Sequence, residues 1–111
     1  MIETSRQGAV TVIQSEARFN DEFVELLQPA IEDCMGQGVP MAVIDLESTF
    51  LINSVGLEYL LDAGDQFRDK GGSLKLASPT PLCAEILAIT ELDCELEVYD
   101  NVNQAVRSFA K

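Results

Sequence analysis

The chain has 111 residues, of which 47% are hydrophobic and 23% charged, a composition typical of a folded globular protein. This length predicts a single domain over residues 1–111, large enough to bury a core without disulfide bonds. Nineteen acidic residues against seven basic ones give a net charge of −12. Binding to nucleic acid or to anionic lipid requires clusters of Lys and Arg, so both are excluded as functions. We expect instead a protein partner with a basic surface.

Side chains that support catalysis or metal binding are scarce. The sequence contains no histidine, the commonest general base and metal ligand. Its cysteines, Cys34, Cys83 and Cys94, are widely spaced, and we expect reduced thiols, with Cys34 and Cys83 packed on apolar helix faces. We therefore expect neither an enzyme nor a cofactor or metal site. No signal peptide and no apolar run of roughly 18 residues is present, which predicts a cytoplasmic protein without membrane insertion.

Strands and helices alternate from the start of the chain. Residues 2–6 and 10–13 are expected to form strands, the second favoured by its β-branched residues. Asn20 then has the character of a helix N-cap, followed by two acids that suit the helix dipole. The apolar stripe of the next helix stays in phase across Pro29, which predicts one kinked helix and not two. Its apolar face contains Phe23, Leu26, Leu27, Ala30, Ile31 and Cys34.

The middle of the chain predicts a buried strand followed by a second helix. Residues 41–46 form a nearly continuous apolar run, typical of a strand covered on both faces. Residues 47–53 are expected to be a loop, and a helix is expected to begin near Ser54. Its apolar face contains Leu57, Leu60, Leu61, Gly64 and Phe67.

The last third continues the alternation. A strand is expected at residues 74–77, and a third helix after Pro79 and Pro81, because proline is tolerated in a first helical turn. A short strand at residues 97–99 and a final helix, capped by Asp100 or Asn101, complete the chain. This alternation predicts an α/β fold whose sheet is at least partly parallel.

Residues 41–61, MAVIDLESTFLINSVGLEYLL, contain the most informative motif. An apolar strand ending in Asp-Leu, a short loop, an apolar pair and then Asn53-Ser54-Val55-Gly56-Leu57 at a helix start resemble the signature of STAS domains, and in particular of bacterial anti-sigma factor antagonists. Residues 17–20 and 71–74 also resemble turns of that family, so the resemblance covers essentially the whole chain. It implies a mixed sheet of four to five strands with about four helices packed mainly on one face.

The resemblance also implies partner switching. In anti-sigma factor antagonists, a partner kinase that also holds a sigma factor phosphorylates a motif serine, the unphosphorylated form binds that kinase, and a phosphatase resets the system. The phosphoacceptor position matches Ser54, and the motif's Asp matches Asn53. The second hydroxyl position is Val55. We expect the partner-binding residues to be Asn20, Asn53, Ser54, Val55, Gly56, Leu57, Glu58, Asp62 and Asp65.

The position of Ser54 suits a phosphate, because a helix N-terminus presents unpaired N–H groups and partial positive charge. The plainer interpretation is that Ser54 is only the N-cap of its helix. Along the same helix, carboxylates at spacings of four, three and four predict an outward stripe, which is either a docking face for a basic groove or a solvated surface. The stripe consists of Glu58, Asp62, Asp65 and Asp69.

Two further questions stay open at this level. A constitutive STAS scaffold, for example an accessory subunit of an ABC-type lipid-transport ATPase, is the alternative function, favoured by Asn53 and Asn20 where antagonists have acids. The sequence does not distinguish a monomer from a weak dimer. A second acidic cluster matches no calcium loop and is expected to be solvated surface. It contains Glu85, Glu91, Asp93, Glu95, Glu97 and Asp100.

Overall fold

The computed structural model describes residues 2–110 and contains two sheets. The larger sheet comprises β1 (Glu3–Gln7), β2 (Val10–Gln14), β4 (Met41–Asp45), β6 (Ser73–Ala77) and β7 (Val98–Tyr99), which are neighbours in that order. The β1 strand is antiparallel to β2, and the other neighbouring pairs are parallel. The predicted mixed sheet is thus confirmed, with each strand within about one residue of its expected position.

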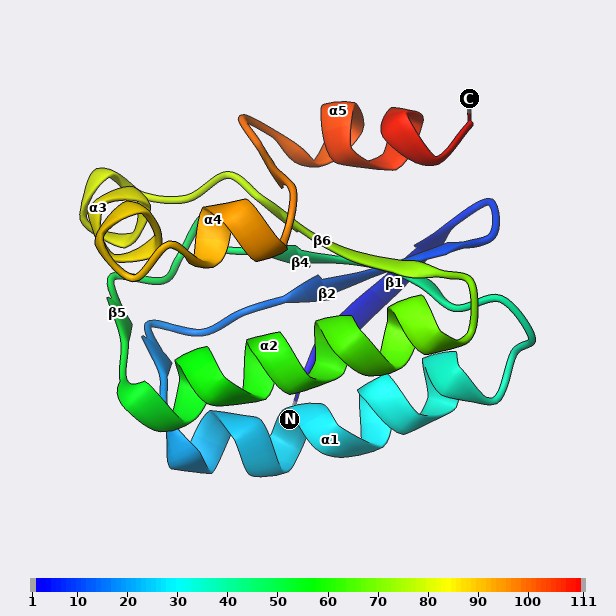
Figure 1. The fold of residues 1–111 in the computed structure, drawn as a ribbon, viewed down its shortest axis with the longest axis horizontal. Helices are drawn as coiled ribbons and strands as arrows, with labels where there is room; N and C mark the ends of the chain where they lie inside the picture. The colour runs from blue at the N-terminus through cyan, green and yellow to red at the C-terminus, as the bar shows by residue number, and fades with distance from the viewer. Residues whose placement is uncertain (1, 111) are drawn as a thin grey trace.

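Helices cover this sheet unequally (Figure 1). Two long helices, α1 (Asp21–Met35) and α2 (Ser54–Asp69), lie side by side under one face and run in the same direction. At one end of the sheet lie α3 (Pro81–Ile89) and the short α4 (Leu92–Glu95), a turn that the sequence pattern did not indicate. The predicted single helix across Pro29 is confirmed. No helix within residues 2–110 combines the length and the apolar character that crossing a bilayer requires.

The main core lies between the sheet and the α1–α2 layer. Alternate residues of β4 point to opposite faces, so Ala42 and Ile44 join this core while Val43 packs on the other side. The prediction of a strand covered on both faces is therefore confirmed. Cys34 and Cys83 are buried in the same core, as expected.

Two predicted core positions were wrong. The side chains of Leu26 and Leu61 are 41% and 37% exposed. Each lies one residue, about 100°, from the centre of its buried helix face, which is Leu27 in α1 and Leu60 in α2. The buried face of each helix is therefore rotated from its predicted stripe, so that Val24 in α1 and Ala63 in α2 are buried while Leu26 and Leu61 are exposed.

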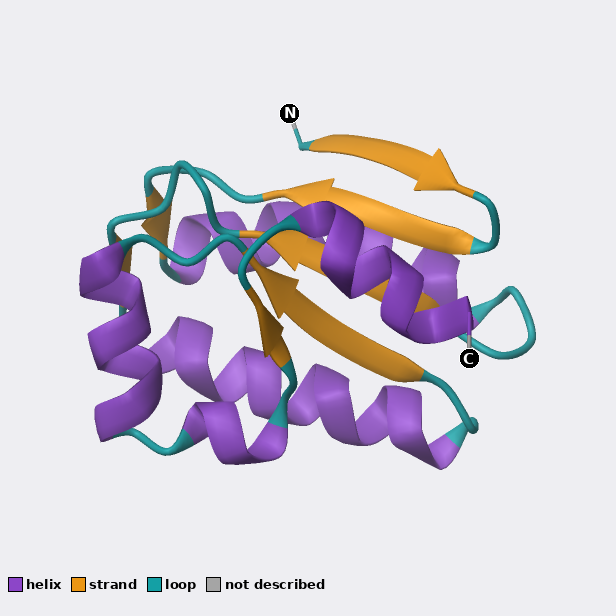
Figure 2. Cartoon of the chain, turned by 90° about the horizontal axis from the view of Figure 1, so that it is seen from above, coloured by secondary structure: helices purple, strands orange, loops and turns teal. Residues whose placement is uncertain are grey.

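The opposite face is covered by α5 (Val102–Arg107) and a following 3₁₀ turn, Ser108–Ala110 (Figure 2). The apolar core beneath α5 is small, and a buried cation, Lys75, which is only 6% exposed, lies on the same face of the sheet. The Lys75 Nζ donates to the Ser108 Oγ at 2.6 Å, lies 3.3 Å from the Glu97 carboxylate, and sits 4.2 Å from the ring centroid of Phe109. A charged contact therefore contributes to holding the C-terminal segment on the sheet.

The smaller sheet corrects two expectations. Residues 17–20 were expected to be a turn and residues 47–53 a loop, but they contain β3 (Arg18–Phe19) and β5 (Leu51–Ile52), which pair in parallel. Strands of two residues are too short to give a sequence pattern. Since Phe19 pairs with Ile52, the residues that follow them, Asn20 and Asn53, are held next to each other.

Candidate functional site

The candidate site lies where α1 and α2 begin. Asn20 is the N-cap of α1, its Oδ1 accepting from the Phe23 N–H at 3.2 Å. Asn53 is the N-cap of α2, its Oδ1 accepting from the Gly56 N–H at 2.9 Å. The Asn53 Nδ2 also donates to the Asp21 Oδ1 at 2.9 Å. The Asn53 side chain therefore caps α2 through its oxygen and links the start of α2 to the start of α1 through its nitrogen.

Ser54 is the first residue of α2 and is exposed. Its hydroxyl has no hydrogen-bond partner among residues 2–110. The interpretation of Ser54 as the N-cap is wrong, because Asn53 performs that function. The fold thus leaves the Ser54 hydroxyl open to solvent at a helix N-terminus, where backbone N–H groups and the helix dipole favour an anion.

Gly56 allows the close approach of α2 to β3. A Cβ at this position would lie 2.5 Å from the Phe19 carbonyl oxygen and 2.7 Å from the Phe19 Cδ1, so only glycine fits without displacement. Gly56 is buried, and Leu57 is half-buried against the main core. Two residues of the expected partner-binding set therefore lie mostly beneath the surface, where they shape the site.

The remaining residues of that set lie at the surface. Asn20 and Asn53 are half-buried, whereas Val55, Glu58, Asp62 and Asp65 are exposed. Glu58 lies one turn after Ser54, and the other carboxylates continue along α2 away from it. Asp65 forms an ion pair with Arg68. The stripe therefore points outward, as its spacing predicted.

Three residues of the site were missed by sequence reasoning. Phe50 and Leu51 immediately precede the buried Ile52 and are 52% and 42% exposed. Asp21 was interpreted only as a dipole acid, but it also bridges to Asn53. An apolar pair within an expected loop was the available signal for Phe50 and Leu51. The start of α2 is consequently flanked by both apolar and acidic surface.

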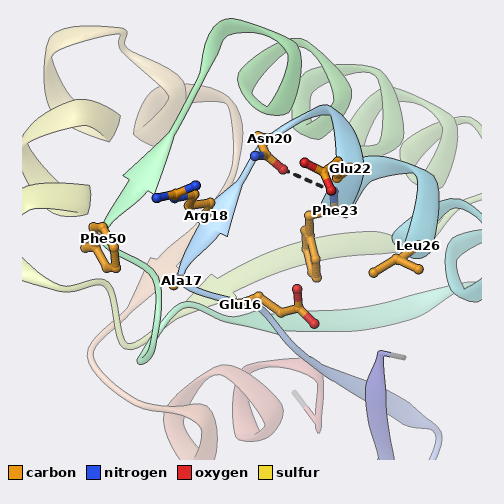
Figure 3. A pocket seen from close by; sticks show the side chains of 8 residues that line it. All are labelled: Glu16, Ala17, Arg18, Asn20, Glu22, Phe23, Leu26 and Phe50. Carbon is orange, nitrogen blue, oxygen red and sulfur yellow. Dashed lines mark hydrogen bonds between the residues drawn. The ribbon is translucent and has the colours of Figure 1, made fainter.

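An open pocket of about 520 Å³ lies on the α1 side of β3 (Figure 3). One cation, Arg18, and two carboxylates, Glu16 and Glu22, stand among its described lining residues, together with an apolar part formed by Phe23, Leu26 and Phe50. This mixture does not favour an anionic ligand. The pocket extends the apolar and acidic surface of the site from α2 to α1.

Within residues 2–110, no group of three or more His, Cys, Asp or Glu side chains is placed to hold a metal ion. Burial raises the pKa of the Cys34 thiol, and the neighbouring Asp93 carboxylate is the main cause of the raised pKa of Cys94. A raised thiol pKa lowers the fraction of reactive thiolate. Neither thiol is therefore activated by its surroundings.

Known proteins share this architecture. A protein of Planctomyces limnophilus described as an anti-sigma-factor antagonist (STAS) domain protein is 26% identical, with a TM-score of 0.84 and coverage of 99% of this chain and 98% of its own. The Bacillus cell fate determinant SpoIIAA in its phosphorylated form is 15% identical, with a TM-score of 0.73 and coverage of 98% and 99%. A sulfate transporter family protein of Wolinella succinogenes is 14% identical, with a TM-score of 0.80 and coverage of 94% and 87%.

The comparison with curated protein sequences gives no match. The family model described as the STAS domain, however, matches residues 1–105, nearly the whole chain. The chain belongs to the STAS domain family.

Proposed function

We propose that residues 1–111 act as one cytoplasmic, non-enzymatic binding module of the anti-sigma factor antagonist type, which binds a partner serine kinase and is switched by phosphorylation of Ser54. The observation that carries this proposal is the state of Ser54. Its side chain is exposed, and the capping of α2 by Asn53 leaves the hydroxyl without a role in the fold. A kinase could therefore modify Ser54 without unfolding the domain.

The surroundings of Ser54 support a switch that acts on binding. A phosphate adds about −1.5 to −2 charge at neutral pH. Asp21 and Glu58 already place negative charge beside Ser54, so the phosphate would enlarge an acidic region next to the apolar Val55. In a docked interface this charge would have to lose its water or face a partner's acid. A coupling of about 1–3 kcal/mol changes affinity roughly 5- to 150-fold, which is sufficient for release.

The likeness to SpoIIAA supports the same proposal, because that protein has been solved in a phosphorylated form. The low identity limits the likeness to the fold, so the assignment to Ser54 rests on the motif and on exposure. In this proposal, unphosphorylated Ser54 lies inside the partner interface, and a phosphatase restores it. The partner-facing residues are Asn20, Asn53, Ser54, Val55, Glu58, Asp62 and Asp65, supported from beneath by Gly56 and Leu57.

A second candidate is a constitutive STAS scaffold in which Ser54 contacts a partner and is never modified. The bridge from Asn53 to Asp21 favours this candidate, since the position that holds an acid in antagonists is here occupied by an amide with a structural role. The similarity to a sulfate transporter family protein also shows that this fold occurs in proteins other than anti-sigma factor antagonists. In this case an ABC-type ATPase, and not a serine kinase, would be the partner.

The test is the mass of the protein recovered from its own cells during growth and under stress, with peptide mapping around Ser54. We expect the mass of one phosphate on the peptide that contains Ser54, varying with condition and absent from Ser54→Ala. The Ser73→Ala variant is the matched control, because it leaves Ser54 intact and should keep the phosphate.

Co-purification identifies the partner in the same experiment. A serine kinase that co-purifies with wild type and with Ser54→Ala, but in a smaller amount when the Ser54 peptide carries phosphate, agrees with the proposal. An unmodified Ser54 in every condition, together with a co-purifying ABC-type ATPase, would show that the scaffold candidate is correct.

A further inference from the structure

The outer face of α3 carries an unusual apolar stripe. Only one of the nine residues of this helix, Glu85, is charged. Cys83 and Leu87 on its inner side are buried in the main core. On the outer side, residues at the helical spacing i, i+4 and i+7 form what we call the α3 stripe: Leu82, which is 50% exposed, the half-buried Ile86, and Ile89, which is 79% exposed. A helix that is apolar on both sides normally has both sides covered.

The α3 stripe lies at the same end of the molecule as Ser54 (Figure 1). The first turn of α3 is tied to the residue before Phe50, because the Thr80 Oγ1 and the Cys83 Sγ both donate to the Thr49 carbonyl oxygen, at 2.7 and 3.1 Å. The helix also contacts β5 directly. Exposed apolar side chains therefore occur on α3, at β5 (Phe50 and Leu51) and in the first turn of α2 (Val55), and apolar patches of this kind mark interaction sites.

The charge around the α3 stripe restricts what can cover it. Residues 81–100 contain no Lys or Arg, and all six carboxylates of this segment are exposed. A second copy of the chain would bring another net charge of −12 against them, and anionic lipid would be repelled for the same reason. The occupant that fits is a protein whose apolar patch is surrounded by Lys and Arg.

We propose that the α3 stripe is the apolar anchor of the interface that contains Ser54, and that it receives an apolar patch ringed by basic residues on the same partner. The identity of that partner rests on the function proposed above. The anchor divides the interface into two parts. Phosphate at Ser54 changes one edge of the interface, while the stripe continues to attract the partner, so phosphorylation weakens binding without abolishing it.

The test places a photo-crosslinking amino acid in the full chain at position 55, 82 or 89, in its own cells, and identifies the attached protein by mass spectrometry. Position 39 is the matched control, since Val39 is 55% exposed in the loop between α1 and β4, at the opposite end of the molecule. We expect one and the same protein at positions 55, 82 and 89, and not at position 39.

The other outcomes overturn the proposal in recognisable ways. Attachment of the chain to itself at positions 82 and 89 would show a second copy as the occupant. A different protein at position 89 from that at position 55 would show two separate interfaces, and no product at either 82 or 89 would show a stripe that nothing covers. One partner at all three positions, with Ser54 never phosphorylated, keeps the anchor and rejects only the switch.

Affinity measurements with the identified partner complete the test. Ile89→Gln should weaken binding about tenfold or more, because replacing an apolar anchor by a polar side chain leaves an amide to be desolvated in the interface. Val39→Gln should leave binding within about twofold of wild type. Urea unfolding of each variant shows that it is folded, and equal binding by Ile89→Gln and wild type would refute the anchor.

Discussion

The N-termini of α1 and α2 have the same kind of cap but differ in the charge of their first turns. Each helix begins with an asparagine that follows a strand of the small sheet and whose side chain accepts from the backbone three residues on. The first turn of α1 then contains Asp21 and Glu22, which balance the positive end of the helix dipole. The first turn of α2 contains no acid, and Ser54 occupies the position that corresponds to Asp21.

This difference indicates which helix start is available for recognition. At α1 the fold supplies its own negative charge, and Asp21 accepts from the Asn53 amide. At α2 the dipole is left without an acid in its first turn, and the first side chain is an exposed hydroxyl. Two nearly equal local structures therefore differ in what they present, an acid bonded to the neighbouring helix start at α1 and an exposed hydroxyl at α2.

The largest effect is expected from disturbing the close packing of the α2 N-terminus on Phe19, the residue before the α1 cap. Gly56→Ala places a methyl group against the Phe19 backbone and ring, which should lower the free energy of unfolding by about 2–3 kcal/mol, measured by urea denaturation. Gly64→Ala is the control in the same helix, because its methyl group would meet only the end of the Leu96 side chain. A loss at Gly64 equal to that at Gly56 would contradict this account.

Removing the two caps separately measures what the Asn53 amide adds. Asn20→Ala should cost about 1 kcal/mol, the usual value of an N-cap. Asn53→Ala should cost more, up to about 2 kcal/mol, because the bridge to Asp21 is lost as well. Equal losses of stability would show that the bridge contributes nothing.

An acid introduced into the first turn of α2 should stabilise that helix, as Asp21 and Glu22 stabilise α1. Ser54→Asp should raise the free energy of unfolding by about 0.5 kcal/mol at low ionic strength, since an acid in the first turn interacts favourably with the dipole. The gain should shrink in high salt. Ser54→Asn, of similar size and without charge, is the control and should show no salt-dependent gain. A destabilised Ser54→Asp variant would mean that the site does not accommodate an anion.

The smallest effect concerns the contact between the two helices further along. Burial, and then the Glu32 carboxylate of α1, raise the pKa of Tyr59 in α2 to about 12. An unfolded tyrosine ionises near pH 10. The contribution of Tyr59 to stability is therefore complete below about pH 10 and is lost as the pH rises towards 12. Between pH 9 and pH 11 the urea midpoint should fall less in Tyr59→Phe than in wild type, and equal falls in both would contradict this account.

Much of this fold could be predicted from the sequence because it depends on long periodic segments. The stripe through Pro29, the apolar run at residues 41–46 and the glycine turns each contain enough residues to identify an element. The two-residue strands could not be predicted, because Phe19 and Ile52 are buried through pairing with each other and not through a local pattern. The wrong predictions for Leu26 and Leu61 have the same origin, since the position of a buried face around its helix depends on what packs against it.

The sequence could indicate the centre of the candidate site but not its edges. The centre, Ser54 in a short motif at a helix start, stays a prediction from that motif, and the structure shows only that it is exposed. The edges depend on tertiary contact. The Asn53–Asp21 bridge joins residues 32 positions apart, and the α3 stripe adjoins β5 only because Thr80 and Cys83 bind the Thr49 carbonyl oxygen. No spacing within the sequence encodes these neighbours.

Lys75 has a consequence for the order in which parts of the molecule open. The segment that contains α5 is held by a small apolar core and by contacts to one buried ammonium group. Segments with few apolar contacts open locally at lower free energy than the rest of a domain. The amide protons of α5 should therefore exchange with solvent before those of β4, and each opening would expose Lys75 to water. We therefore expect the C-terminal segment to open as a separate cooperative unit, on the face of the sheet away from Ser54.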